Sequence, residues 1–180
     1  MKDFRLNAKQ LRTVKPDHEI MKSLKKNSIY LILDNVLDTY NIGAIFRLAD
    51  ATATRKIYLC GETETPPNPR IKKASVNTWQ WVDWEYSANS VEVMKRLRRE
   101  VHDIRIYALE QHPDSISYAR FKPHFPLAII IGNETYGISA SVLKKADQII
   151  ELPMFGVNKS LNVMVSCGII LYKILEQIKR

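Results

Sequence analysis

Glu151-Leu-Pro-Met-Phe-Gly-Val-Asn-Lys-Ser-Leu-Asn162 reads as an apolar strand end, a turn with proline and glycine, and a polar step into an apolar helix. Earlier in the chain, Ile129-Ile-Ile-Gly-Asn-Glu-Thr-Tyr-Gly137 reads as a second strand that stops at glycine. A third segment, Asn41-Ile-Gly-Ala-Ile-Phe-Arg47, follows the first predicted strand. Such polar, glycine-containing loops predict a ligand site at the carboxyl ends of a parallel sheet.

Short β-branched apolar runs alternate with stretches of helical period along the chain, which is typical of βαβ units. The pattern predicts strands at 29–33, 56–59, 81–84, 104–109, 127–131 and 148–152, and helices at 42–51, 70–76, 90–101, 139–146 and 162–179. A length of 180 residues suits one compact domain. We therefore expect a single α/β domain with a mostly parallel sheet.

The composition is that of an ordinary globular protein, with 46% hydrophobic and 26% charged residues and no apolar run long enough to span a membrane. The charged N-terminus does not resemble a secretory signal. Two cysteines, Cys60 and Cys167, lack the spacing of metal ligands. These features predict a cytoplasmic protein without a structural metal.

The net charge of +8 is concentrated before the first strand. In residues 1–27 the basic residues are Lys2, Arg5, Lys9, Arg12, Lys15, Lys22, Lys25 and Lys26, and the acidic ones are Asp3, Asp17 and Glu19. A basic helical arm of this kind could bind a polyanion, or it could be a solvated helix that happens to be basic. A proline-rich loop on the rim of the three motif loops is followed by Arg70, Lys72 and Lys73. These residues too could face a nucleic-acid backbone, or their role could be structural.

Familiar catalytic motifs are absent from the sequence. Ile138-Ser139 stands where a phosphate loop needs Lys followed by Ser or Thr, no dinucleotide-binding glycine fingerprint occurs, and the four histidines share no motif. The predicted site therefore has neither a covalent nucleophile nor a metal. Transfer of an already activated group, such as a sulfonium methyl, needs only positioning and charge stabilisation, and fits these residues.

Three motifs together resemble the SpoU or TrmH type of RNA ribose 2′-O-methyltransferases within the SPOUT superfamily. They are Asn41-x-Gly43-x-x-x-Arg47, Ile131-Gly132-Asn133-Glu134-x-x-Gly137, and Leu152-Pro153-Met154-x-Gly156-x-x-x-Ser160-Leu161-Asn162-Val163. The resemblance covers roughly residues 29–175, and departs from the family pattern at 164–167. It implies a methyltransferase domain at 28–180, a deep C-terminal trefoil knot that holds S-adenosylmethionine, and a homodimer with the active site near the subunit interface.

The resemblance also implies roles for individual residues. The donor, which leaves as S-adenosylhomocysteine, would be held by Ile131, Gly132, Asn133, Gly137, Ile150, Leu152, Met154, Gly156, Ser160 and Leu161. The catalytic residues would be Arg47, Asn41, Glu134, Ser160 and Asn162. Arg47 would bind the phosphate beside the target ribose and stabilise the emerging alkoxide, or act as a general base assisted by that phosphate.

Each catalytic assignment has a structural alternative. Asn41, Ser160 and Asn162 could cap helices, Glu134 could be a solvated loop residue, and Arg47 could form a salt bridge. The predicted function is an S-adenosylmethionine-dependent RNA 2′-O-ribose methyltransferase acting on tRNA, which we favour, or rRNA. The alternatives are an RNA-binding protein that kept the fold without the activity and an RNA base methyltransferase.

Overall fold

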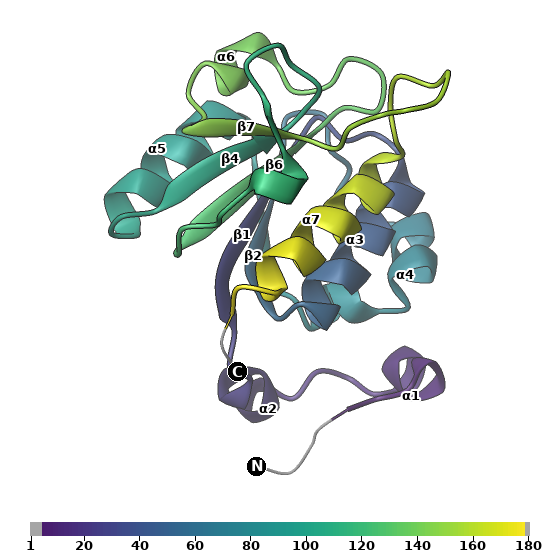
Figure 1. Cartoon of the computed structure of the whole chain (residues 1–180). Coiled ribbons are helices and arrows are strands. Elements are labelled where there is room, and N and C mark those ends of the chain that lie inside the picture. The colour runs from purple at the N-terminus through teal and green to yellow at the C-terminus, as the bar shows by residue number, and fades with distance from the viewer. Residues whose placement is uncertain (1–4, 179–180) are drawn as a thin grey trace.

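A parallel sheet forms the centre of the computed structural model, which describes residues 5–178 apart from the side chain of His18 (Figure 1). Its strands are β1 (Asn27–Asp34), β2 (Thr54–Cys60), β3 (Trp84–Ser87), β4 (Arg105–Leu109), β5 (Ile116–Ser117), β6 (Leu127–Gly132) and β7 (Gln148–Glu151). They lie in the order β3-β2-β1-β6-β4-β7-β5, and every neighbouring pair is parallel. The predicted α/β domain is confirmed.

Helices cover both faces of this sheet. The α-helices of the described chain are α1 (Ala8–Thr13), α2 (His18–Ser23), α3 (Thr39–Ala51), α4 (Pro69–Ser75), α5 (Ser90–Glu100), α6 (Ala140–Leu143) and α7 (Val163–Leu175), of which α1 and α2 lie away from the sheet faces. Helices α3, α4 and α7 lie on one face, and α5 and α6 on the other (Figure 1). Asn68 caps α4 and is followed by proline at the first helical position.

Alternation along the central strands divides the core into two parts. Ile29, Leu31 and Leu33 of β1 pack with α3 and α7, whereas Tyr30 and Ile32 pack toward α5. This follows from the pleat, which points successive side chains to opposite faces. Each fully buried side chain of this size contributes roughly 1.5–3 kcal/mol of transfer free energy, so the apolar strands stabilise both layers.

The strand predicted at 81–84 is wrong. Residues Thr78–Gln80 form a 3₁₀ turn and β3 begins only at Trp84, while Trp81 is buried away from the sheet. A short apolar run has the same composition whether it enters a sheet or packs beneath a helix, which explains the error. Helix α7 ends at Leu175, and Lys179, the predicted end, lies outside the described residues.

The basic segment before β1 contains two short helices, and α1 contacts the domain. The side-chain amide of Asn77, just beyond α4, donates hydrogen bonds to the carbonyls of Leu11 and Arg12 at 3.2 and 3.3 Å. Lys2 and Asp3 of this segment lie outside the described residues. Within residues 5–178, no helix has the length and apolar character that a membrane crossing requires.

Candidate functional site

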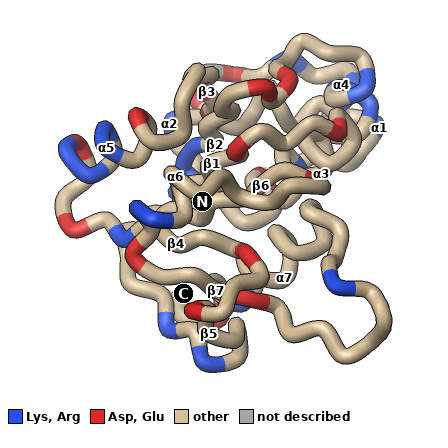
Figure 2. Tube along the Cα trace, turned by 90° about the horizontal axis from the view of Figure 1, so that it is seen from above, with Lys and Arg blue, Asp and Glu red and all other residues tan. Residues whose placement is uncertain are grey.

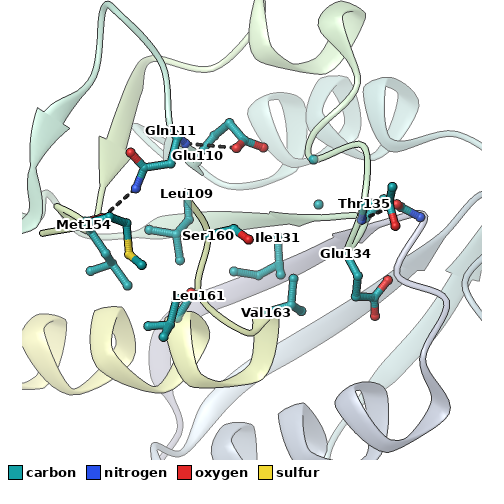
Figure 3. Close-up of a pocket in the computed structure, with 15 residues that line it drawn as sticks. Leu109, Glu110, Gln111, Ile131, Glu134, Thr135, Met154, Ser160, Leu161 and Val163 are labelled. Carbon is teal, nitrogen blue, oxygen red and sulfur yellow. Dashed lines mark hydrogen bonds between the residues drawn. The ribbon is translucent and has the colours of Figure 1, made fainter. Parts of the chain in front are cut away.

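A pocket lies at the carboxyl ends of β4, β6 and β7, beside the start of α7 (Figure 3). It is lined by Leu109, Glu110, Gln111, Ile131, Gly132, Asn133, Glu134, Thr135, Gly137, Leu152, Met154, Ser160, Leu161, Val163 and Ser166. Figure 3 shows apolar side chains from two strands and from the start of α7 grouped at its centre, with Gln111 and Glu134 toward opposite ends. The pocket is thus apolar in the middle and polar at its ends.

The loop after β6 is bounded by glycine at both ends and closed by backbone hydrogen bonds. Asn133 and Gly137 exchange backbone hydrogen bonds of 3.0 Å, and Gly137 has a φ of +68°. A Cβ on Gly137 would lie 2.2 Å from a carboxylate oxygen of Glu110, and one on Gly132 would lie 2.4 Å from the backbone nitrogen of Ile138. A larger residue at 132 would therefore have to move the backbone that lines the pocket, whereas one at 137 would displace the Glu110 carboxylate and hold a strained positive φ.

The end of β4 ties the loops of the pocket together. The Glu110 carboxylate accepts hydrogen bonds from the backbone amides of Ile138 at 2.8 Å and Gln111 at 2.9 Å. The side-chain amide of Gln111 donates to the carbonyl of Leu152 at 2.6 Å. Sequence reasoning missed this part of the site. Its signal was a polar pair directly behind a predicted strand, the same feature that marked the other rim loops.

A hydrogen-bonded chain joins the three sequence motifs. The side-chain amide of Asn41 donates to Glu134 at 2.9 Å, and its oxygen accepts from the Asn162 side chain at 3.1 Å. Asn41 is only 5% exposed. The Glu134 carboxylate also accepts from the backbone amides of Leu37 and Asp38, both at 3.0 Å. Residues far apart in sequence thus form one polar unit beside the pocket.

Glu134 is a carboxylate stabilised in its charged form. Burial alone would raise its pKa, but the hydrogen bonds from Asn41, Leu37 and Asp38 outweigh that effect and lower the pKa below its usual value. The side chain is therefore ionised near neutral pH. It fixes the start of α3 and the orientation of Asn41, rather than remaining a free loop carboxylate.

The structural alternatives have different outcomes for different residues. Asn162 does cap α7, since its side-chain oxygen accepts from the backbone amides of Met164 and Val165. Its side-chain nitrogen donates the hydrogen bond to Asn41. Asp38, not Asn41, caps α3. Ser160 is not a cap, and its side chain lines the pocket.

Arg47 lies on an exposed part of α3, outside the pocket lining. Among the residues that the structure describes, its guanidinium forms neither a salt bridge nor a hydrogen bond. The structural salt bridge considered for Arg47 is therefore not found there, and its charge is available to a ligand.

Eight of the ten residues predicted to hold a donor line the pocket: Ile131, Gly132, Asn133, Gly137, Leu152, Met154, Ser160 and Leu161. Ile150 is instead fully buried in the core, and Gly156 lies on a loop where a Cβ would meet nothing within 4 Å. Within residues 5–178, no group of three or more His, Cys, Asp or Glu side chains is placed to hold a metal ion.

A second hollow, called here the rim groove, adjoins the pocket. It is lined by Leu37, Asp38, Thr39, Glu64, Asn68, Pro69, Arg70, Asn133, Glu134 and Thr135, and encloses about 800 Å³. The pocket encloses about 160 Å³. The two hollows share residues 133–135, so only the loop after β6 separates them.

Comparison with known proteins gives a consistent result. A model of the SpoU rRNA Methylase family matches residues 28–172. A tRNA (guanosine(18)-2′-O)-methyltransferase of Aquifex aeolicus is 30% identical over 165 residues, covering 88% of this chain and 74% of the relative. A 23S rRNA (guanosine-2′-O-)-methyltransferase of Neisseria meningitidis serogroup B is 26% identical, covering 88% of this chain and 62% of the relative.

A solved structure has the same fold. The SpoU methyltransferase AviRb of Streptomyces viridochromogenes, in complex with the cofactor AdoMet, superposes with a TM-score of 0.77 at 24% identity, covering 89% of this chain and 61% of that one. This chain therefore spans less than two thirds of the Neisseria and Streptomyces proteins.

Proposed function

The chain belongs to the SpoU rRNA Methylase family, and from this premise we propose that it transfers a methyl group from S-adenosylmethionine to a ribose 2′-hydroxyl of tRNA or rRNA. The observation that carries the proposal is the hydrogen-bonded chain from Glu134 through Asn41 to Asn162 beside the pocket. Relatives named for this reaction on both RNA classes support it.

The pocket fits the proposed donor. Apolar walls from Leu109, Ile131 and Val163 suit a flat adenine ring, and polar groups at both ends suit the ribose and the charged amino acid. When bound, S-adenosylmethionine supplies an activated methyl on a sulfonium, and S-adenosylhomocysteine is left. At about 160 Å³ the pocket is smaller than ordinary ligand pockets, which hold about 300–1,000 Å³. The exposed loop at 153–161 would therefore close over the donor and form the rest of its site. Phe155 on that loop is 96% exposed and available to cover it.

The polar chain and Arg47 act on the acceptor. Asn41 and Asn162 hold the edge of the site in one arrangement, so that little reorganisation is needed when RNA binds. Arg47 binds the phosphate next to the target ribose and stabilises the oxygen as its proton leaves. Ser160, on the wall of the pocket, orients the ribose.

Residues 28–180 form the methyltransferase domain, and residues 1–27 form a basic extension that shares in RNA binding. The C-terminal part of the domain forms the family's trefoil knot. Two hydrogen bonds between distant segments support the knot. The Gln111 side chain donates to the carbonyl of Leu152, and the Asn162 side chain donates to that of Asn41. The reaction takes place in the cytoplasm, with tRNA as the favoured substrate.

A homodimer completes the site. Helix α7 carries an exposed apolar stripe at helical spacing, consisting of Val165, Ile169 and Tyr172, which are 39%, 38% and 55% exposed. Tyr40 of α3 is also half exposed. Helices α3 and α7 lie together in Figure 1, so a second copy on this face would lie near the helix that carries Arg47.

The proposal is tested with ribose-methylation maps of total tRNA and rRNA from cells with and without the gene. One or more 2′-O-methyl marks should disappear with the gene and return when purified protein and donor are added. A target RNA carrying 2′-deoxyribose at the mapped nucleotide should accept no methyl group. Transfer to that RNA, or a product still cleaved by alkali at the site, would indicate base methylation instead.

A further inference from the structure

The pocket presents negative charge and no positive charge. Among the described residues that line it, Glu110 and Glu134 are acidic, and none is lysine, arginine or histidine. Seen from above, many of the lysines and arginines lie toward the outside of the domain, on α5 and at α4 (Figure 2). A ligand that carries an additional positive charge is therefore attracted to the pocket more strongly than an uncharged ligand of the same shape.

The Glu110 carboxylate is fixed at the edge of the pocket. One of its oxygens accepts from the backbone amide of Ile138 at 2.8 Å, and the other accepts from the amide of Gln111 at 2.9 Å (Figure 3). Within residues 5–178, no lysine, arginine or histidine forms a salt bridge with it. Its charge is therefore held in position by backbone groups and is not neutralised by a described side chain.

A second carboxylate, Asp34, lies behind the pocket at the end of β1, beside Gly132 of β6. It is 3% exposed and accepts from the hydroxyl of Ser90 at 2.5 Å and from the amide of Ser139 at 3.0 Å. In the described part of the chain it has no salt bridge either. Ser139 follows the residue whose amide Glu110 holds, so the two carboxylates bind neighbouring amides of the loop that lines the pocket.

We propose that these two fixed carboxylates make the pocket selective for the charge on the donor's sulfur, so that S-adenosylmethionine is held and S-adenosylhomocysteine is released. This inference rests on the proposed function. Donor and product share their ammonium and carboxylate groups, and differ by one methyl group and the positive charge on sulfur. When the carbon–sulfur bond breaks, its electron pair stays on sulfur, which becomes a neutral thioether. Methyl transfer thus removes the charge that Glu110 and Asp34 attract.

The same attraction predicts a particular change in the kinetics. A carboxylate that stabilises the sulfonium acts on the bound donor more than on the transition state, in which the positive charge on sulfur is already diminishing. Neutralising Glu110 should therefore raise the KM for the donor without lowering kcat at saturating donor. A loss of kcat is what a merely distorted pocket would show.

The experiment is calorimetry on the full-length protein without RNA, with three ligands. They are S-adenosylmethionine, S-adenosylhomocysteine and sinefungin, an analogue that carries an ammonium group in place of the methylated sulfur. Wild-type protein should bind the two ligands with the additional charge roughly five- to thirtyfold more tightly than S-adenosylhomocysteine. Glu110→Gln should lower that ratio about three- to tenfold, with the affinity for S-adenosylhomocysteine nearly unchanged.

A second variant and a control accompany this measurement. Asp34→Asn removes the buried charge with little change in shape, and should also lower the ratio, so it decides the matter if Glu110→Gln does not fold. Glu62→Gln removes an exposed carboxylate that follows β2 and does not line the pocket. Because solvent and salt screen an exposed charge, this control should keep the wild-type ratio.

The outcomes separate this inference from the proposed function. If wild-type protein binds neither donor nor product, the proposed function loses its donor site. If it transfers methyl groups but binds S-adenosylhomocysteine as tightly as S-adenosylmethionine, the function stands and charge selection is overturned. Charge selection is equally overturned if the folded carboxylate variants weaken all three ligands by the same factor, because the carboxylates then only shape the loop.

Discussion

Arg47 carries a charge that no side chain in the described part of the chain neutralises. Replacing Arg47 with alanine should abolish methyl transfer and leave both donor affinity and the free energy of unfolding nearly unchanged, because no described side chain pairs with it. Steady-state kinetics, calorimetry with the donor and urea unfolding measure the three quantities. Arg47→Lys is the matched control, since it keeps the charge but loses the planar donor fork, and should retain only part of the activity. Loss of folding in Arg47→Ala would restore the salt-bridge interpretation.

Glu134 makes a prediction about pH. Its folded-state pKa is lowered, so its hydrogen bonds contribute stability that is present above the unfolded-state pKa and is lost as pH falls through the folded one. Wild-type protein should therefore be more stable than Glu134→Gln at pH 7, and the difference should shrink below about pH 4. Urea unfolding of both proteins across that range tests this. A difference that is constant with pH would show that the charge of Glu134 is not what fixes the loop.

At the scale of elements, α1 offers a test of the basic extension. Changing Lys9, Arg12 and Lys15 to glutamine should weaken RNA binding and flatten its salt dependence by up to about 0.7 per lost phosphate contact. Substitution is preferable to deletion, because Lys26 and Asn77 link this segment to the domain. Changing Lys122, Lys144 and Lys145 removes the same charge elsewhere and should leave the slope unchanged. If wild-type protein and both triple variants show the same slope of log affinity against log salt, the extension is only a solvated surface.

Most elements of this fold were predictable, because the surface helices carry a period of 3.6 residues and the central strands β1 and β6, buried on both faces, are continuous apolar runs. The strand placed at 81–84 failed for want of such a period, and the two residues of β5 offer none. In the site, glycine and polar loops marked the rim, yet Glu110 was missed. The contact between Asn41 and Asn162 depends on α7 returning beside α3, which local pattern does not encode.

For the whole molecule, the pocket lies within one chain, so donor binding should not require RNA. Calorimetry should detect S-adenosylmethionine and S-adenosylhomocysteine binding to RNA-free protein. The Gly132→Ala variant should bind neither, because its Cβ would displace the backbone at Ile138. Its circular dichroism spectrum serves as the folding control. If wild-type protein binds neither ligand, the donor pocket is assigned wrongly.

The exposed stripe on α7 makes a prediction about assembly. Ile169→Glu should convert the dimer to monomer, because it places a charge in the middle of an apolar contact. Sedimentation measures the change, and methyl transfer should be lost with it while the monomer stays folded. Lys95→Glu, on the opposite face of the sheet, is the control and should remain dimeric. A wild-type protein that sediments as a monomer would contradict the proposed dimer.

The position of β1 in the sheet has a consequence for biosynthesis. One edge of β1 pairs with β2, but the other can pair only once β6 has been synthesised, with Ile29 opposite Leu127. At about 5–20 residues per second, a ribosome delivers β6 some 5–20 s after β1. During that interval an apolar strand edge is open in the nascent chain, the kind of surface that holdase chaperones protect. The last link to Asn41 forms only after Asn162 has been synthesised, so the emerging polypeptide cannot act on RNA before then.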